Sequence, residues 1–193
     1  MSKNLKMSLD RARKIAERFE KYISPFCVKI SIAGSVRREC EMVGDLEFVI
    51  VPKDEFSMGI AFPEGFKGLV TNGTRLKRFK YPESGIQIEL HVTTLADYGR
   101  ILAISTGSSV FSHGLAVQWN RRGLCGTMDG LRYKRECDHK GSTWRIKPEY
   151  KNCPTLPPPF ITEEDFFAFI GIEWIEPQKR SWVSSKAEYN YSL

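Results

Sequence analysis

The sequence lacks any apolar run near the ~20 residues that a membrane-spanning helix needs, which argues against a transmembrane protein. Residues 1–6 are polar and too few to form a secretory signal peptide, so a secreted protein is not expected either. The sequence also contains no internal repeat. We therefore expect a cytoplasmic protein with no membrane partner.

The chain also lacks the closely paired cysteines of a zinc knuckle, in which two residues separate the thiols. The plain interpretation of its odd number of cysteines is reduced thiols in a cytosolic compartment. One alternative is a small metal site formed by Cys137, His139 and Cys153, which a single Cys-x-His pair supports only weakly. The thiols are those of Cys27, Cys40, Cys125, Cys137 and Cys153.

The sequence does contain many large apolar side chains and an excess of basic ones. Hydrophobic residues make up 41% of the 193 residues, including 12 Phe, 7 Tyr and 4 Trp, so the chain can bury a core without disulfide bonds. Lys and Arg number 29 against 23 Asp and Glu, which gives a net charge of +6. This excess suits a polyanionic partner, but it is also common in proteins that bind no nucleic acid.

Apolar spacing in the first half predicts an α+β fold. Residues 8–23 have the period of an amphipathic helix, with Ser8 as a suitable N-cap. Alternating and β-branched segments predict strands over 27–33, 45–51 and 86–93, and Asn72-Gly73 is a hairpin signal between two short runs. Residues 53–70 are expected to form a loop, with one helix as an option.

The second half differs in character, and we place a boundary near residue 95. Helices are predicted over 95–122 with a break at 106–108, and short strands over 124–150. The segment 154–159 is too rich in proline for a helix and is expected to be an extended connector. Thr162 and Asp165 stand at capping-box spacing, which predicts a final helix through Phe169.

Three acidic residues are candidates for a metal site. Asp45 and Glu47 are two residues apart on a predicted strand, so both side chains leave the same face. Glu89 is the lone acid of the third strand, and the three carboxylates meet if that strand lies beside the second. Such carboxylates repel one another unless cations such as a pair of Mg²⁺ ions relieve the repulsion. The alternative is that Asp45 is a turn residue, while Glu47 and Glu89 face water on a one-sided sheet.

A Gly34-Ser35 turn follows the first predicted strand and precedes a short polar segment. Backbone N–H groups at such a helix start can bind an anion. Arg37 and Arg38 follow, and an arginine can bind a phosphate through two hydrogen bonds. A phosphate site just before a carboxylate pair is a combination that phosphoryl transfer requires, because two metal ions stabilise both the attacking and the leaving oxygens.

The segment from Gly34-Ser-Val-Arg-Arg38 to Gly44-Asp-Leu-Glu47 resembles the signature of the family X DNA polymerases, the polymerase beta group of nucleotidyltransferases. Ile88-Glu-Leu90 resembles the strand with that family's third metal carboxylate, and Thr106-Gly107-Ser108 follows at the family's spacing. Residues 162–180 are similar to the family's closing segment, so the resemblance spans about residues 8–182.

This resemblance implies a nucleotidyltransferase palm over residues 1–94 and a C-terminal nucleotide-selecting (thumb) subdomain over 95–193. No N-terminal lyase domain is expected, as in the short viral members, and a phage or viral source would place the protein in the host cytoplasm. The implied cofactor is two Mg²⁺ ions, with Mn²⁺ as an option. The implied partners are gapped or primer–template DNA and nucleoside triphosphates, bound by a monomer that repairs DNA.

The resemblance also implies a role for each matching residue. Asp45 and Glu47 bind both metals, and Glu89 binds the catalytic one near the primer 3′-OH. The incoming nucleotide is bound by its phosphates and by the segments around the sugar and base, and the Gly107–Ser108 peptide matches a position that is cis in the family. The nucleotide-binding residues are Gly34, Ser35, Arg38, Val43, Gly44, Ser105, Thr106, Gly107, Ser109 and Ser112.

The sequence also departs from the family. Two of the three metal positions are Glu where the family usually has Asp, and Gln87 replaces an Arg beside the third carboxylate. Ile104-Ser105 replaces a Tyr-Phe pair that crowds the sugar 2′-position, so we expect weak discrimination against ribonucleotides. Ser109, Ser112 and Ala116 replace residues that usually contact the incoming base or the minor groove, so we also expect low fidelity.

Several basic residues are candidates for contact with the DNA backbone, with a solvated surface as the alternative. We expect one basic strand face, because the basic residues alternate with Leu76 and Phe79. The candidates are Arg75, Lys77, Arg78, Lys80 and His113. Two other functions stay open: a template-independent or RNA-directed nucleotidyltransferase, and a DNA-binding relic without catalytic activity.

Overall fold

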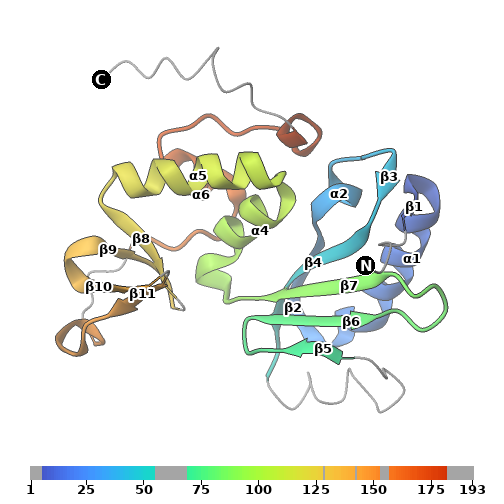
Figure 1. Cartoon of the computed structure of the whole chain (residues 1–193), viewed down its shortest axis with the longest axis horizontal. Helices are drawn as coiled ribbons and strands as arrows, with labels where there is room; N and C mark the ends of the chain where they lie inside the picture. Colours follow the sequence, from blue (N-terminus) through green and yellow to red (C-terminus); the bar gives the residue numbers. More distant parts are fainter. Residues whose placement is uncertain (1–5, 55–68, 128, 142, 153–156, 182–193) are drawn as a thin grey trace.

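The structure is a computed structural model and describes residues 6–54, 69–127, 129–141, 143–152 and 157–181. Its centre is a five-stranded sheet in the order β2-β4-β7-β6-β5 (Figure 1). The two central strands, β4 (Asp45–Pro52) and β7 (Gln87–Val92), are parallel, and the other pairs are antiparallel. The flanking strands are β2 (Cys27–Ile32), β5 (Leu69–Asn72) and β6 (Leu76–Lys80). This mixed sheet with helices confirms the predicted α+β class.

One face of the sheet packs against α1 (Leu9–Ile23). The Phe19 ring lies 5.0 Å from the ring of Phe48 and 5.7 Å from that of Phe79, measured between centroids, and all three side chains are buried. Ser8 occupies the N-cap position as predicted, but its side chain makes no capping hydrogen bond. Ser8 belongs instead to β1 (Met7–Ser8), which pairs with β3 (Met42–Val43).

The opposite face of the sheet packs against α4 (Tyr98–Thr106). Tyr98 and Leu102 contact Val49 and Val51, and the Tyr98 hydroxyl donates to Ser31 Oγ over 2.7 Å. Helix α4 therefore covers the part of this face that carries valines. The part that carries the acidic residues of β4 lies beyond it, beside α2 (Gly34–Arg37).

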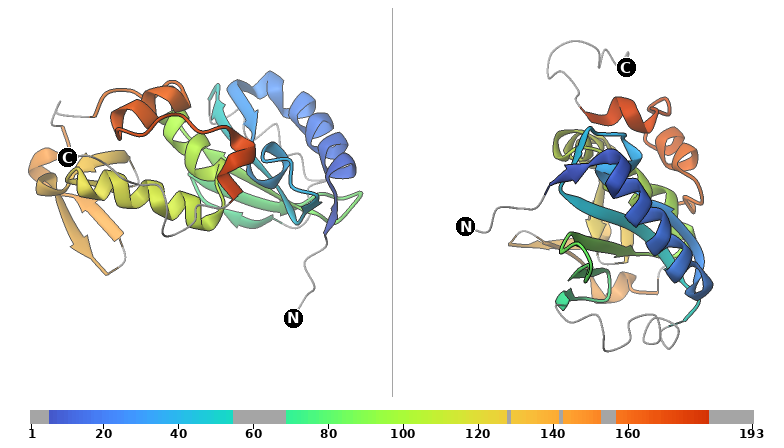
Figure 2. Two further views of the ribbon diagram at one scale, coloured as in Figure 1. Left: turned by 90° about the horizontal axis from the view of Figure 1, so that it is seen from above. Right: turned by 90° about the vertical axis from the view of Figure 1, so that its right-hand side faces the viewer.

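The second half of the chain has its own apolar core, in which Phe111, Trp119, Phe166 and Phe167 are buried together. They come from α5 (Ser109–Arg121) and α6 (Glu163–Phe169). Two hairpins follow α5 and lie at the end of the molecule away from α1 (Figure 2). Their strands are β8 (Leu124–Thr127), β9 (Gly130–Tyr133), β10 (Cys137–Lys140) and β11 (Thr143–Ile146).

Most of the predicted elements are confirmed, including the break between α4 and α5 and a complete capping box of Thr162 and Asp165 at α6. The predicted loop at 53–70 and connector at 154–159 lie largely outside the described residues. Short 3-10 helices occur at Ser24–Phe26, Leu95–Asp97, Lys134–Glu136, Pro148–Tyr150 and Pro177–Ser181. Within the described part of the chain, no helix is both long and apolar enough to cross a membrane.

Candidate active site

The three predicted acidic residues lie on one face of the sheet. Because β4 and β7 are parallel neighbours in register, Glu47 pairs with Glu89 and Asp45 pairs with Gln87. Residues that pair across strands point to the same side, so Asp45, Glu47 and Glu89 project together on the face opposite α1. The intervening Leu46 is fully buried in the core on the α1 side. The structure therefore places the acids as the alternation of the sequence predicted.

The charges of these acids interact strongly. The pKa of Asp45 is raised to about 6, first by burial and then by the nearby charges of Glu47 and Glu89. The guanidinium groups of Arg38 and Arg78 lower this pKa, but their effect is the smaller one. A carboxyl group whose ionised form is disfavoured in this way is stabilised by an added cation. The electrostatics of the site thus fit divalent cations, which oxygen ligands of this kind bind.

Glu89 is held in place by two neighbours. Gln87 Nε2 donates to Glu89 Oε1 over 2.6 Å, and Arg78 Nε lies 2.8 Å from the same oxygen in an ion pair. Gln87 stands on the same strand as Glu89, and Arg78 on the neighbouring strand β6 brings a guanidinium to the same carboxylate. Arg78, which was predicted to contact DNA, is thus paired with a carboxylate of the acidic cluster.

The prediction of one basic strand face is wrong. Arg78 and Lys80 pair with Glu89 and Gln87, whereas Lys77 pairs with Leu90 and so lies on the opposite face. Side chains alternate along β6, and Lys77 is one residue from Arg78 and three from Lys80, so it lies on the other face from both. Arg75 precedes the strand and lines a cleft beside the acids.

His91 is a member of the site that the sequence analysis missed. It stands two residues after Glu89 on β7 and therefore shares its face. Its Nε2 lies 3.6 Å from Glu47 Oε1, and ligand atoms of Glu47, Glu89 and His91 all lie within 4.8 Å of one another. The spacing of Glu89 and His91 on a predicted strand was the available signal, but the contact with Glu47 depends on the pairing of the two strands.

The Gly34–Ser35 corner lies directly against the acids. A Cβ atom added to Gly34 would come within 1.8 Å of Glu47 Oε2, and the φ angle of Gly34 is +59°. Only glycine meets both requirements without displacing the carboxylate. The Ser35 hydroxyl is buried and has no hydrogen-bond partner among the described residues. The predicted phosphate-binding corner and the predicted metal ligands are thus immediate neighbours.

The two arginines after this corner contact the second half of the chain. Arg37 donates to Glu163 through both NH1, at 2.8 Å, and NH2, at 2.7 Å, and its NH1 also donates to Thr106 Oγ1 over 2.7 Å. Arg38 NH1 donates to the Thr106 carbonyl oxygen over 2.6 Å, so part of this predicted phosphate ligand is engaged within the protein. These contacts join segments 68 to 126 residues apart, so spacing along the sequence did not predict them.

Glu163 is the centre of a buried ion-pair network. Besides Arg37 it accepts hydrogen bonds from Arg180 NH1 and NH2, at 2.6 and 3.2 Å, and Arg180 is fully buried. Burial alone raises the pKa of Glu163, but the hydrogen bonds and charges of the two arginines outweigh it, and the net pKa is lowered. This network fixes α2 to α6 and to the segment at Pro177–Ser181.

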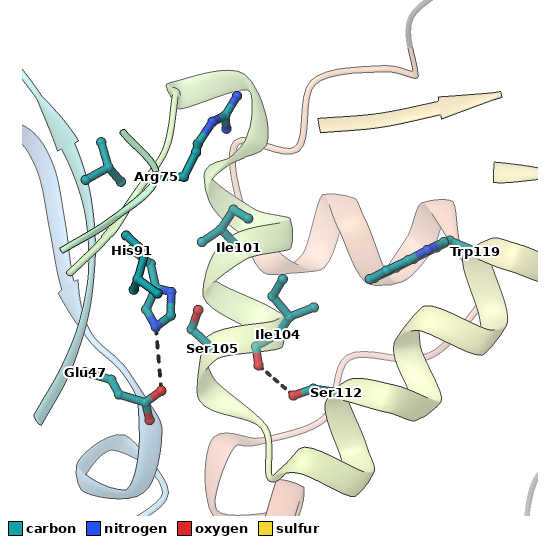
Figure 3. Close-up of a pocket in the computed structure, with 10 residues that line it drawn as sticks. Glu47, Arg75, His91, Ile101, Ile104, Ser105, Ser112 and Trp119 are labelled. Atoms are coloured by element: carbon teal, nitrogen blue, oxygen red, sulfur yellow. Dashed lines mark hydrogen bonds and ion pairs between the residues drawn. The ribbon is translucent and has the colours of Figure 1, made fainter. Parts of the chain in front are cut away.

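A cleft of about 470 Å³ separates the acidic face of the sheet from α4 and α5. Figure 3 shows Glu47 and His91 on one wall and Ser105 and Ser112 on the other. Trp119 and Ile104 supply apolar parts of the lining. The volume is typical of a small-molecule site, and the mixture of apolar and polar lining suits a ligand with both kinds of surface.

The predicted nucleotide-binding residues differ in their access to this cleft. Ser105 and Ser112 line it, but the Ser112 hydroxyl donates to the Ile104 carbonyl oxygen over 2.6 Å. Thr106 is fully buried and Val43 is fully buried, so their side chains do not reach the cleft. Gly44, Gly107 and Ser109 are at least partly exposed, as is His113 on α5. The Gly107–Ser108 peptide is trans, which is contrary to the expectation from the family.

The alternative metal site among the cysteines receives no support from the described residues. Cys137 is buried, and the His139 ring stacks on Trp144 with centroids 4.5 Å apart. Cys153 lies outside the described residues.

The site as a whole is therefore built from β4, β7 and the corner before α2. It brings three carboxylates and one imidazole together, with Arg78 and Arg38 close by, and two of these groups, Glu47 and His91, line the cleft. Compared with known proteins, the chain is matched by no family model and by no curated sequence.

Proposed function

We propose that this chain is a metal-dependent nucleotidyltransferase that adds nucleotides to a primer 3′-OH, as a DNA polymerase of the gap-filling repair type. One observation carries the proposal: Asp45, Glu47 and Glu89 leave the same face of two adjacent parallel strands, directly beside the Gly34–Ser35 corner. Paired divalent cations are the usual partners of such acids in phosphoryl transfer. The proposed fold is accordingly a nucleotidyltransferase palm with a C-terminal nucleotide-selecting subdomain.

In this proposal the acids hold two cations, Mg²⁺ or Mn²⁺, which neutralise charge on the reacting phosphate. Asp45 and Glu47 would bind both, and Glu89 would bind the one near the primer 3′-OH. Arg78 and Gln87 keep the Glu89 carboxylate oriented by binding its Oε1. A metal-binding carboxylate that is held by neighbouring side chains in this way is oriented before the substrate arrives.

The incoming nucleoside triphosphate is proposed to occupy the cleft between the sheet and helices α4 and α5. Its phosphates would lie at the Gly34–Ser35 corner, where the buried Ser35 hydroxyl lacks a partner among the described residues. Arg38 would exchange its contact with the Thr106 carbonyl oxygen for a phosphate. Ser105 on the cleft wall leaves space beside the sugar, which supports the proposal of weak sugar discrimination.

The polyanionic partner is proposed to be gapped or primer–template DNA, which suits the net charge of +6. Arg75 at the cleft and Lys80 near Gln87 are the remaining basic candidates on the acidic face of the sheet. Extension of a primer across a short gap tests the proposal, with Mg²⁺ or Mn²⁺, with and without a template strand, and with both deoxyribo- and ribonucleotides.

Template-directed products that disappear in Asp45→Ala would support the proposed polymerase. Equal extension without a template would favour the template-independent enzyme, and extension on an RNA template alone would favour the RNA-directed one. A wild-type protein that binds DNA but is as inert as Asp45→Ala would favour the relic. Rates for ribo- and deoxyribonucleotides that differ by more than ~1000-fold in kcat/KM, about 4 kcal/mol, would contradict the weak sugar discrimination.

A further inference from the structure

One ring nitrogen of His91 has an unsatisfied hydrogen-bonding capacity. The ring nitrogen Nε2 is buried and has no hydrogen-bond partner among the described residues, although Glu47 Oε1 lies 3.6 Å away. A buried polar atom without a partner costs free energy, so each such atom in a native protein needs an explanation, such as an ordered water molecule, a bound ion or a catalytic role. The nitrogen lines the same cleft as Glu47 (Figure 3).

We propose that His91 is a ligand of one divalent cation, together with Glu47 and Glu89, and that its nitrogen makes this cation Mn²⁺ or a similar transition-metal ion in preference to Mg²⁺. The inference rests on the proposed function, because it assigns the identity of a cation in the same site. Ligand atoms of three side chains converge here, and one of them is an imidazole nitrogen. This nitrogen distinguishes the group from a cluster of acidic residues alone.

The distances allow this coordination with small side-chain rotations. The three donor atoms lie within 4.8 Å of one another. Bonds of ~2.1 Å to a common ion would bring the donors to separations of about 3 Å. Glu89 is already fixed through Oε1 by Arg78 and Gln87, so Glu47 and His91 are the side chains that would turn.

The ligand types decide the preference between metals. Mg²⁺ takes oxygen ligands almost exclusively and keeps much of its water shell. Imidazole nitrogen binds transition-metal ions more strongly than it binds Mg²⁺. Asp45 and Glu47 offer carboxylate oxygens alone, whereas Glu47, Glu89 and His91 offer two carboxylates and one nitrogen. The two proposed cation positions would therefore differ, because only the cation that Glu89 binds would also have the His91 nitrogen as a ligand.

The direct test is binding of Mn²⁺ to untagged, metal-free protein, followed by electron paramagnetic resonance with detection of ¹⁴N coupling and by calorimetric titration. The variant is His91→Phe, which keeps a planar ring of similar size but has no donor. The matched control is His139→Phe, because His139 is exposed and stacks on Trp144 far along the chain from the acids. Mg²⁺ is titrated in parallel against all three proteins.

We expect a ¹⁴N coupling in the wild type and in His139→Phe that disappears in His91→Phe, with Mn²⁺ affinity reduced about 10- to 100-fold. Mg²⁺ affinity should change less than about threefold, since Mg²⁺ favours the oxygen ligands that remain. The ¹⁴N signal of the wild type needs no variant, so the test survives a variant that fails to fold. Mn²⁺ bound without ¹⁴N coupling would overturn the inference and assign His91 to an ion pair with Glu47.

The same experiment separates this inference from the proposed function. Nitrogen-coordinated Mn²⁺ in a protein that extends no primer would uphold the role of His91 and contradict the polymerase. Metal bound through oxygen alone in a protein that extends primers would support the polymerase and contradict the role of His91. Absence of any divalent cation binding would contradict both.

Discussion

Two acidic centres in this molecule differ in how their negative charge is balanced. At the junction of α2 and α6, one carboxylate, that of Glu163, lies between the guanidinium groups of Arg37 and Arg180. On the sheet, the acidic cluster has three carboxylates, those of Asp45, Glu47 and Glu89. Among the described residues, one arginine, Arg78, forms an ion pair with this cluster, and His91 lies 3.6 Å from Glu47. The first centre has more positive than negative groups, whereas the second has more negative than positive groups.

The pKa values follow this difference. The pKa of Glu163 is lowered although its side chain is only 4% exposed, whereas that of Asp45 is raised to about 6 although it is less deeply buried. A balanced buried network holds elements of the fold together. An unbalanced cluster costs stability and is retained where a bound cation or a reaction requires it, since such shifts concentrate at functional sites.

Removing one carboxylate from the acidic cluster should give the largest effect on activity. In the proposed function, Asp45→Asn removes a ligand to both cations and should lower the rate of primer extension by more than ~1000-fold, about 4 kcal/mol. Single-turnover extension of a gapped duplex measures it. Glu149→Gln, at an exposed carboxylate after the hairpins, is the control and should leave the rate within about twofold. A rate for Asp45→Asn within tenfold of wild type would contradict the assignment of the cluster.

Breaking the balanced centre should chiefly affect stability. Glu163→Gln leaves two arginines without their countercharge, one of them fully buried, and should lower the free energy of unfolding by about 3 kcal/mol at pH 7. Because the pKa of Glu163 is lowered on folding, its contribution is full above its unfolded value of about 4.3 and is lost as the pH falls through the folded value.

Urea unfolding of wild type and Glu163→Gln at pH 7 and below pH 4 measures this contribution. The difference between the two proteins should shrink in acid. A difference that stays constant from pH 7 into acid would show that the charge of Glu163 does not stabilise the fold.

The corner beside the cluster should be intolerant of a side chain. Gly34→Ala would place a methyl group 1.8 Å from Glu47 Oε2 and displace that carboxylate. A displacement near 1 Å costs about 100-fold in rate. Gly85→Ala is a matched control, because Gly85 has a similar positive φ of +68° but no atom within 4 Å of the added Cβ. If both variants lost the same activity, backbone strain rather than the position of Glu47 would be the cause.

The same Asp45→Asn variant should be more stable than wild type in the absence of metal. A pKa raised on folding means that ionised Asp45 opposes folding, so its favourable contribution holds below about pH 4 and is lost as the pH rises through 6. Solvent screens this partly exposed group, so we expect a gain on the order of 1 kcal/mol at pH 7.5 and none at pH 4. Denaturant unfolding with a chelator present measures the gain, and a less stable variant at pH 7.5 would refute this interpretation.

The elements of the fold that depend on neighbouring residues were predictable. The period of α1, the alternation of β4 and the capping box at Thr162 each act within a few residues, where the sequence pattern fixes the structure. The shared face of Asp45 and Glu47 followed from the same alternation. Glu89 lies beside them because β7 pairs with β4. The sequence predicted this position only on the assumption that the two strands are neighbours.

The parts that could not be predicted depend on register and on distant segments. His91 meets Glu47 only because the two strands pair with Val49 opposite His91, and Arg78 meets Glu89 only through the pairing of β6 with β7. Arg37 and Glu163 are 126 residues apart. Spacing along the chain contains no information on such contacts, since they arise from how the elements pack.

The acidic cluster has fewer positive than negative groups, and we propose that divalent cations supply the missing positive charge. The decisive measurement is thermal unfolding of metal-free protein with and without Mn²⁺, with the wild type compared to the triple variant D45N/E47Q/E89Q. At about 100 times the dissociation constant, a bound cation adds ~2.7 kcal/mol, which should raise Tm of the wild type by about 5–10 °C and leave the triple variant unchanged. An equal shift in both proteins, or no shift in the wild type, would contradict the claim.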